Sequence, residues 1–332
     1  MFYDLIIIGG GPAGTAAGVY AARKRIKTIL ITLEFGGQSI VSPDVQNFIG
    51  IVSLPGIELA ERLKKHLEAY AEDVLEIKEG ESVTKLEKIQ EEFQVCTDKG
   101  MCYRGKTVFI ATGSSRKKLN VKGADIFDNK GISYCASCDA PLFRGKITAV
   151  IGGGNAGFEA AQQLLAYCPS VTLLEFGAEF RADAVTIQQV SKNPKFTAIK
   201  NAQTLEVYGK DFVEGLKYKN RKTGEMSDLE VEGIFVEIGS IPNSNSVKDL
   251  LKSVPKPTWW EQPSPTNWTE GLDTFGQILV DHKTQRTAIE GLWAAGDVTD
   301  VLYKQNNISM GDAVKAVEDI YLWLVQHHTV RT

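Results

Sequence analysis

Two cysteines separated by two residues, Cys135 and Cys138, are the residues of this chain best suited to chemistry, and an acid, Asp139, follows them directly. A C-x-x-C pair is typical of a redox disulfide, of half a zinc site or of two incidental thiols. Zinc needs two further ligands, and the four histidines show no matching spacing. The redox interpretation fits the chemistry, because two intervening residues permit closure and a stabilised thiolate is a competent nucleophile. We therefore expect a redox dithiol and no metal.

The other three cysteines are scattered, and a total of five is an odd number for a mid-sized chain. This pattern argues against a framework of structural disulfides. We expect Cys96, Cys102 and Cys168 to be small buried apolar residues.

Two glycine-rich loops flank the dithiol along the sequence. Gly9–Gly14 follows the apolar run 6–8 and precedes a small-residue segment, Thr15 to about Arg25, that predicts a helix. Gly152–Gly157 has the same form, with a helix expected to about Tyr167 and a strand over Val171–Leu174. In G-x-G-x-x-G the first glycine permits the tight turn, the second lets the backbone approach a pyrophosphate, and the third brings helix and strand together. Two such loops predict two dinucleotide-binding folds.

Several residues of these folds are candidates for nucleotide contacts. Glu34 lies where a carboxylate binds the adenosine ribose, and Asp297, after the strand-like run before Gly296, suits a ribityl hydroxyl or caps a final helix expected over Asp312 to Val325. The loop positions themselves are Gly9, Gly11, Pro12 and Gly14 in the first copy and Gly152, Gly154, Asn155 and Gly157 in the second.

Composition excludes some classes of partner. The 332 residues are 43% hydrophobic and 23% charged, with a net charge of -4, which is ordinary for a soluble globular protein. The chain lacks the basic surplus of nucleic-acid or anionic-membrane binders, so we expect neither partner. Its first residues show neither the basic region nor the apolar run of a signal peptide, which predicts a cytoplasmic protein.

The order of these motifs resembles a known family, the low-molecular-weight thioredoxin reductases. The resemblance is closer still to the reductase portion of the flavoprotein subunit of alkyl hydroperoxide reductase. That subunit carries an additional N-terminal pair of thioredoxin-like folds, and this chain starts at the flavin domain, so we expect a separate protein to perform their role. The segments that carry the resemblance are Gly9–Gly14, Phe35–Gln38, Asn47, Ala111–Gly113, Tyr134–Asp139, Pro141–Lys146, Gly152–Gly157, Val171–Phe176, Ala295–Asp297 and Tyr303–Gln305.

The resemblance implies an α/β architecture of two Rossmann-like, three-layer ββα domains of the pyridine nucleotide-disulfide oxidoreductase type, the second inserted into the first. An FAD-binding domain would comprise residues 1–116 and 245–332, and an NAD-binding domain carrying the dithiol would comprise residues 117–244. The crossings fall near Ser114–Lys118 and Gly239–Asn243, both rich in turn residues. In the family the inserted domain rotates on such crossings, and the enzymes are homodimers, so we expect both here.

The resemblance also implies roles for single residues. Cys138 would face the flavin, Cys135 would attack the disulfide of a small thioredoxin- or glutaredoxin-like protein, and Asp139 would move the proton. Reduction would start from a nicotinamide nucleotide and pass through FAD. Further FAD contacts would come from Gly37, Gln38, Asn47, Thr112, Gly296, Asp297, Lys304, Gln305 and Asn306, and a further NAD contact from Gly239.

The choice between NADH and NADPH depends on the residues after the second strand of the inserted domain. Family members that use NADPH place His-Arg-Arg and a further Arg there, and this chain has Glu175, Phe176, Gly177 and Arg181. A carboxylate suits the two ribose hydroxyls of NADH and repels a 2′-phosphate by roughly 4 kcal/mol at ~4 Å and an effective dielectric near 20. NADH is the prediction, and Arg181 leaves the use of NADPH open.

Other functions share parts of this pattern. A ferredoxin or flavodoxin reductase has the fold without the dithiol, and a redox-sensing module would bind FAD and NAD without partner-dependent turnover. A glutathione-type reductase needs its cysteines in the first domain and a large C-terminal dimerisation domain. One segment, Ser253 to Asp273, is rich in Trp and Pro and has no counterpart in the family. It would fold on its own surface or form a dimer contact, or else dock the partner or cover the flavin.

Overall fold

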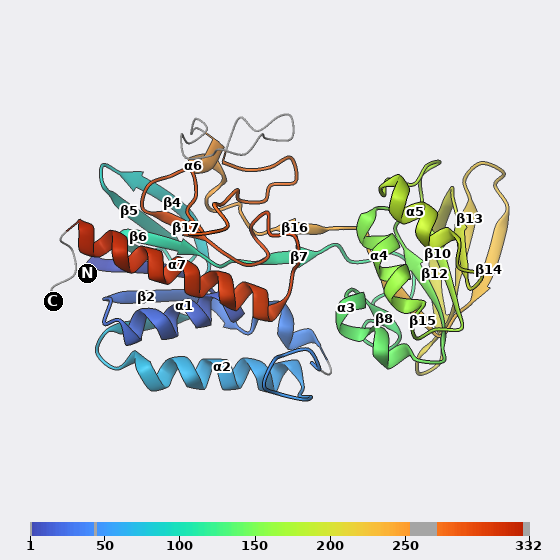
Figure 1. Cartoon of the computed structure of the whole chain (residues 1–332), viewed down its shortest axis with the longest axis horizontal. Coiled ribbons are helices and arrows are strands. Elements are labelled where there is room, and N and C mark those ends of the chain that lie inside the picture. The colour runs from blue at the N-terminus through green and yellow to red at the C-terminus, as the bar shows by residue number, and fades with distance from the viewer. Residues whose placement is uncertain (1, 43–44, 253–270, 328–332) are drawn as a thin grey trace. The chain divides into compact units, whose positions relative to one another are not determined.

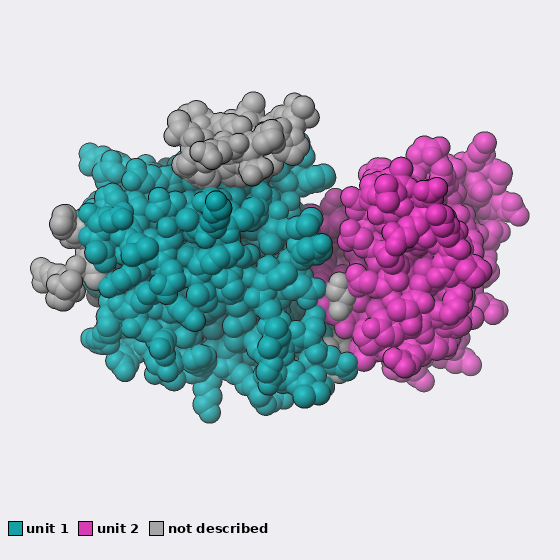
Figure 2. Space-filling model, in the orientation of Figure 1, with its two compact units in different colours: residues 1–115, 241–332 teal, residues 116–240 magenta. Residues whose placement is uncertain are grey.

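A computed structural model describes residues 2–42, 45–252 and 271–327 of the chain. Two compact units result: Met1–Ser115 together with Ile241–Thr332, and Arg116–Ser240, which is inserted between them in sequence (Figure 2). The borders expected from sequence, after residues 116 and 244, lie within a few residues of these. The fold class is the predicted one, α/β with two Rossmann-like units.

The first unit is built on a seven-stranded sheet whose central strands are parallel. Side chains alternate across β1, so Leu5 and Ile7 pack on α1 and α7 while Ile6 and Ile8 pack on the opposite layer, around Ile278. The helices are α1 (Pro12–Arg23), α2 (Gly56–Ala71), α6 (Lys248–Lys252) and α7 (Asn306–Gln326), with a 3-10 turn, η1 (Gly37–Val41). In sheet order the strands are β3 (Leu75–Glu79), β2 (Thr28–Phe35), β1 (Phe2–Gly10), β6 (Cys102–Ile110), β5 (Glu92–Thr97) and β4 (Val83–Ile89), with β17 (Leu292–Ala294) beside β6 (Figure 1).

The second unit repeats this construction with a five-stranded parallel sheet. Ala149 and Ile151 of its central strand face an antiparallel three-stranded layer, and Val150 faces Phe158 and Leu164 of α4. The parallel strands, in order, are β11 (Phe196–Ile199), β10 (Ser170–Leu174), β9 (Ile147–Ile151), β15 (Gly233–Val236) and β8 (Ile132–Ser133). The antiparallel strands are β12 (Ala202–Gly209), β13 (Val213–Asn220) and β14 (Met226–Glu230), and the helices are α3 (Ala136–Asp139), η2 (Ala140–Phe143), α4 (Asn155–Leu164) and α5 (Ala184–Ser191).

The two crossing segments pair with each other as short strands, β7 (Ser114–Arg116) and β16 (Ser240–Pro242). Asn243 fixes the end of this pair: its Nδ2 donates to the Thr112 carbonyl at 2.9 Å, and its Oδ1 accepts from Ser115 Oγ at 2.9 Å. The sequence placed Asn243 at the end of the expected crossing Gly239–Asn243 but predicted no role for its side chain.

Three expectations were wrong in detail. The last helix begins at Asn306, earlier than Asp312. The apolar pattern of residues 276–280 also predicts a strand, and the structure does not form one there; Ile278 makes only isolated bridges to Leu272 and Thr299. The physical reason is that a local turn uses the backbone groups of Gln277: its N–H donates to Asp273 Oδ1 at 2.7 Å, and its carbonyl accepts from the Asp273 N–H at 2.9 Å.

The third correction concerns the cysteines. Cys96 and Cys102 form a disulfide between β5 and β6, with a Cα–Cα distance of 4.1 Å. They are directly opposite partners in the antiparallel register, so they meet across the hairpin instead of lying apart in the core. Cys168 is buried and free, as predicted.

The Trp- and Pro-rich segment Ser253 to Asp273 lies outside the described residues apart from Gly271–Asp273. Among the helices of the described ranges, none combines the length and apolar character needed to cross a membrane.

Candidate functional site

The dithiol lies in one helical turn of the second unit. Cys135 and Cys138 are joined in a disulfide with a Cα–Cα distance of 5.3 Å. α3 starts directly after Cys135, whose carbonyl accepts from the N–H groups of Cys138 at 3.2 Å and Asp139 at 3.0 Å. The turn therefore fixes both sulfurs and the following carboxylate on one short element.

Ser133, at the end of β8, connects that carboxylate to the backbone of the dithiol. Its hydroxyl donates to Asp139 Oδ2 at 2.6 Å and accepts from the N–H of Cys135 at 3.1 Å. Sequence reasoning missed this residue, and the only signal for it was a hydroxyl two positions before the first cysteine. Ser133 holds Asp139 in a defined orientation beside the pair.

A second carboxyl, Glu237, approaches the same turn from the end of β15. Its main-chain N–H donates to the Ile151 carbonyl at 2.8 Å, and the pairing of Phe235 with Ser133 brings this strand end beside the segment that leads to Cys135. Burial raises the pKa of Glu237 to about 7, partly opposed by Arg116 and by the Ala136 N–H, and Glu159 adds to the rise. This residue too was missed, because only the strand register reveals where it lies.

The second glycine loop has the geometry of a pyrophosphate cradle. Gly152 has a φ of +121°, and a Cβ there would lie 2.2 Å from the Glu237 carbonyl oxygen. A Cβ on Gly157 would lie 1.8 Å from the Gly152 oxygen, whereas one on Gly154 would meet no described atom within 4 Å. Gly154 is also the N-cap of α4, with no capping side chain within the described residues. The first N–H groups of α4 are therefore accessible to an anion in open space.

Asn155, the first residue of α4, accepts from the N–H of Asp183 through its Oδ1 at 2.8 Å. Asp183 in turn caps α5 by accepting from Thr186 at 2.8 Å. The predicted site residue Asn155 thus joins two helices, and Gly239, also predicted, lies exposed at the crossing with its carbonyl accepting from Lys117 at 3.0 Å.

Glu175 is held against this loop by its own carboxylate. It is only 3% exposed, and its two oxygens accept from the N–H groups of Gly153 and Gly177, each at 2.6 Å. The next side chain, Phe176, has the Arg221 guanidinium 3.8 Å from its ring centroid. Arg181 is exposed while its N–H donates to the Gly153 carbonyl at 2.8 Å.

The first glycine loop repeats the cradle in the other unit. Gly9 has a φ of +112°, and a Cβ there would lie 2.3 Å from the Ala111 oxygen. A Cβ on Gly14 would lie 1.8 Å from the Gly9 oxygen, while one on Gly11 would meet only the Cα of Gly37, at 3.9 Å. Gly11 is the N-cap of α1 and Pro12 its first residue, with no capping side chain in the described part of the chain. This geometry fits a dinucleotide pyrophosphate.

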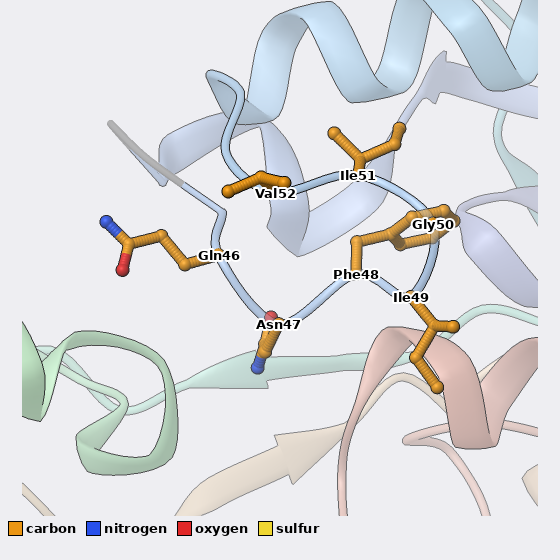
Figure 3. Close-up of a pocket in the computed structure, with 7 residues that line it drawn as sticks. All are labelled: Gln46, Asn47, Phe48, Ile49, Gly50, Ile51 and Val52. Carbon is orange, nitrogen blue, oxygen red and sulfur yellow. The ribbon is translucent and has the colours of Figure 1, made fainter.

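Polar residues from two distant segments meet in this unit, and three of them, Asn47, Gln305 and Asn306, are predicted contacts. Asn47 Nδ2 donates to Gln305 Oε1 at 2.9 Å, and Ser39 Oγ donates to Asn306 Oδ1 at 3.1 Å. Asn47 belongs to the segment 46–52, which lines an open pocket of about 450 Å³ (Figure 3). Gln38 is exposed in η1.

The remaining predicted contacts also lie in the first unit. Lys304 Nζ donates to the carbonyls of Asp297 at 3.0 Å and Thr299 at 3.2 Å, and burial lowers the pKa of Lys304. A Cβ on Gly296 would lie 3.4 Å from that of Ala13, in the first turn of α1.

Thr112 and Glu34 lie at two strand ends of this unit. Thr112 Oγ1 donates to the Asn243 carbonyl at 2.7 Å. Glu34 is exposed near the end of β2, and its carbonyl is 2.9 Å from where a Cβ of Gly10 would be. Within the described ranges, His, Cys, Asp and Glu form no group of three or more that could hold a metal.

The chain is similar in sequence to known oxidoreductases. The family model described as pyridine nucleotide-disulphide oxidoreductase matches residues 3–257. A protein named NADH dehydrogenase from Bacillus subtilis is 38% identical over 98% of this chain and 59% of its own length. An alkyl hydroperoxide reductase subunit of Escherichia coli is 39% identical over 98% of this chain and 59% of its own length. The chain thus spans less than two thirds of these curated relatives.

Solved structures match along nearly their whole length. The thioredoxin reductase of Streptococcus pyogenes is 31% identical, with a TM-score of 0.85, covering 98% of this chain and 99% of that one. The thioredoxin reductase of Giardia duodenalis is 29% identical, with a TM-score of 0.86 and the same coverage.

Proposed function

Since this chain belongs to the pyridine nucleotide-disulphide oxidoreductase family, we propose that it is an FAD-dependent disulfide reductase. It would take electrons from NADH and pass them to the disulfide of a small thioredoxin- or glutaredoxin-like protein. The observation that carries the proposal is the Cys135–Cys138 disulfide, which shares a unit with a nucleotide-type glycine loop. The family implies FAD and a nicotinamide nucleotide; the preference for NADH and the partner are our proposals.

The residues of the first unit fit FAD, which when bound would supply the relay between nicotinamide and dithiol. Gly11 and Gly37 leave room for a pyrophosphate beside the start of α1, which no side chain among the described residues caps. Asn47 and Gln305 offer amide groups from two segments that meet. We assign residues 1–116 and 245–332 to this cofactor and residues 117–244 to the nicotinamide nucleotide.

The dithiol would carry out thiol–disulfide exchange. The Cys135 thiolate attacks one sulfur of the partner disulfide, and the partner's other sulfur leaves as a thiolate that takes up a proton. Cys138 then attacks Cys135, which restores the intramolecular disulfide and releases the second partner thiol. Asp139, oriented by Ser133, would accept and return the protons of these steps.

The fixed carboxylate of Glu175 supports NADH as the donor. A carboxylate has about four acceptor sites, and the two backbone N–H groups occupy one on each oxygen. The remaining sites suit the 2′- and 3′-hydroxyls of an adenosine ribose, and the negative charge repels a 2′-phosphate.

The test is NADH oxidation by the FAD-loaded protein with oxidised thioredoxin as acceptor. Cys138→Ser and Cys135→Ser should each abolish thioredoxin reduction while NADH still bleaches the flavin. Cys168→Ser, which removes the buried free thiol, is the control and should retain activity. Persisting thioredoxin reduction in either dithiol variant would refute the proposal. We also propose a homodimer, which sedimentation of the loaded protein would detect.

A further inference from the structure

Resting on the proposed function, we propose that the Cys96–Cys102 disulfide of the first unit is a second thiol–disulfide exchange site, whose reductant is the dithiol of a reduced thioredoxin-like protein. Cys102 is the sulfur that is attacked, and Cys96 leaves as a thiolate. This reductant is the product of the reaction proposed for Cys135 and Cys138, so the second site responds to the product that accumulates.

The disulfide lies on the outer face of the hairpin that joins β5 to β6, two neighbouring strands of the first sheet (Figure 1). Side chains alternate across a strand, and burial alternates with them. Val95 and Tyr103 are buried on the inner face, whereas Cys96 is half-buried and Cys102 is exposed. The turn residues 98–101 are exposed as well. A thiolate from solvent can therefore reach Cys102 while the hairpin stays closed.

Gln94 distinguishes the two sulfurs of this disulfide. Its Nε2 donates to Cys96 Sγ at 3.6 Å. An N–H donor stabilises a thiolate, and the better-stabilised thiolate is the better leaving group. The charged neighbours on the same face form ion pairs of their own, Lys85–Glu87 and Arg104–Glu92. The amide thus favours Cys96 as the leaving sulfur, which agrees with the greater exposure of Cys102.

The hairpin has contacts that keep it closed without the disulfide. The Thr97 N–H donates to the Met101 carbonyl at 2.9 Å. On the inner face, the buried carboxylate of Glu81 accepts from Thr97 Oγ1 at 3.0 Å and from the Tyr103 hydroxyl at 3.3 Å, both at Oε2. These bonds join the two strands beside the cysteines. The two sulfurs therefore stay opposite each other after the bond between them has broken.

This proximity selects a dithiol over a monothiol. In the first step the attacking sulfur bonds to Cys102, and the Cys102–Cys96 bond breaks to leave a Cys96 thiolate. Held opposite, that thiolate attacks Cys102 again and expels a monothiol. A dithiol avoids this reversal, because its second thiolate attacks its own first sulfur and releases Cys102. Two electrons pass to the protein disulfide, the two cysteines take up protons from water, and the dithiol becomes a disulfide.

The experiment uses the FAD-loaded full chain with Cys135→Ser and Cys138→Ser combined, which leaves Cys96, Cys102 and the buried Cys168. Chemically reduced thioredoxin, or glutathione at the same thiol concentration, is added without NADH. Iodoacetamide then labels new thiols. Thioredoxin should give at least about tenfold more labelling of Cys96 and Cys102 than glutathione, because the paired thiolate reverses the monothiol reaction. No labelling with thioredoxin, or equal labelling with both, overturns the proposal.

Gln94→Leu tests the leaving sulfur. Loss of the amide donor should slow reduction by thioredoxin about threefold, since one hydrogen bond to the departing thiolate is lost. Gln203→Leu is the matched control, because Gln203 is also a half-buried strand residue but lies in β12 of the second unit. Its rate should not change. An unchanged rate in the Gln94 variant, or an equal fall in the control, overturns the proposal.

The unaltered chain gives the same readout if a variant does not fold. Trypsin cleaves after Lys99 and so places Cys96 and Cys102 on different peptides, while Cys135 and Cys138 share a third. Labelling of Cys135 and Cys138 without Cys96 and Cys102 overturns the proposal. The exchange needs no NADH, so its failure is distinct from failure of the proposed function, which is loss of NADH-driven thioredoxin reduction.

Discussion

The two glycine loops, one in each unit, share their backbone geometry and differ in what surrounds it. In both, the first glycine has a positive φ and faces a carbonyl, the third presses on the first, and the second is open. In both, the following helix starts at that second glycine without a capping side chain within the described residues. The common part is what a pyrophosphate requires of any such loop.

Three neighbours differ. The carbonyl facing the first glycine belongs to Ala111 in one unit and Glu237 in the other. The acid after the second strand is exposed as Glu34 but buried as Glu175. In the first loop the Gly10 carbonyl accepts from the N–H of Gly36, and in the second the Gly153 carbonyl accepts from the N–H of Arg181. The inserted unit thus has a glutamate where the first unit has an alanine, a buried acid where the first has an exposed one, and an arginine where the first has a glycine.

The largest effects should come from breaking the shared geometry. An alanine at Gly9 or Gly152 would be strained at positive φ and would clash with a carbonyl, at a cost of about 3 kcal/mol or more. Gly9→Ala should purify with little flavin. Gly152→Ala should keep its flavin and lose reduction by NADH.

Absorbance at 450 nm per protein and the rate of flavin bleaching by NADH separate these two outcomes, with dithionite as the control reductant. If Gly152→Ala lost flavin and Gly9→Ala kept it, the assignment of cofactors to the loops would be reversed.

Substitution of the two acids, Glu175 and Glu34, should have effects on NADH binding that differ nearly as much. Glu175→Gln replaces one acceptor oxygen by an NH2 group that faces a backbone N–H, so a buried donor loses its partner, which costs about 3 kcal/mol for a charged acceptor. We expect KM for NADH to rise roughly 100-fold, since 1.4 kcal/mol is a factor of ten. Glu34→Gln, at an exposed carboxylate, is the matched control for the NADH site and should leave this KM unchanged. Steady-state kinetics decide, and equal KM values in both variants would contradict the proposed role of Glu175.

Glu237 should make the free energy of unfolding depend on pH. Ala111, which faces the first glycine of the other loop, has no side-chain group that titrates. Its pKa rises from 4.5 to about 7 on folding, so the native state binds the proton more tightly than the unfolded state. The free energy of unfolding therefore falls as pH rises from 4.5 through about 7, and the loss is complete above that pH.

Glu237→Gln removes this loss. The variant should be more stable than the parent by about 2 kcal/mol at pH 8 and show no such gain at pH 4. Denaturant unfolding at the two pH values measures the difference. A gain of the same size at both would mean that packing, not ionisation, distinguishes the variant.

The shared geometry was predictable from sequence because its requirements are local. A G-x-G-x-x-G between an apolar run and a small-residue helix has one structural use, and both copies form the expected turn. The pairing of Cys135 with Cys138 was equally predictable, since two cysteines three positions apart share a helical turn.

The differences were not predictable, because they depend on register between distant strands. The Cys96–Cys102 disulfide requires knowing that the two residues are opposite in a hairpin, although the turn signal Asp98-Lys99-Gly100 between them could have suggested it. Glu237 and Ser133 become site residues only through the pairing of β15 and β8. The roles of the predicted contacts in FAD and NAD binding stay predictions.

The smallest effect should come from the residue whose N–H binds the middle glycine of each loop, which is Gly36 in the first and Arg181 in the second. Arg181 occupies the place of Gly36, with its N–H on the Gly153 carbonyl and its side chain exposed. Arg181→Gln keeps the backbone contact and removes a charge that only a 2′-phosphate would use. We expect kcat/KM for NADPH to fall about fivefold, because one exposed ion pair of about 1 kcal/mol is lost. The kcat/KM for NADH should change less than about twofold. Initial rates with NADH and with NADPH measure both changes. An equal fall in kcat/KM for the two nucleotides would show that Arg181 binds a group that both contain. Glu175 alone would then set the preference for NADH.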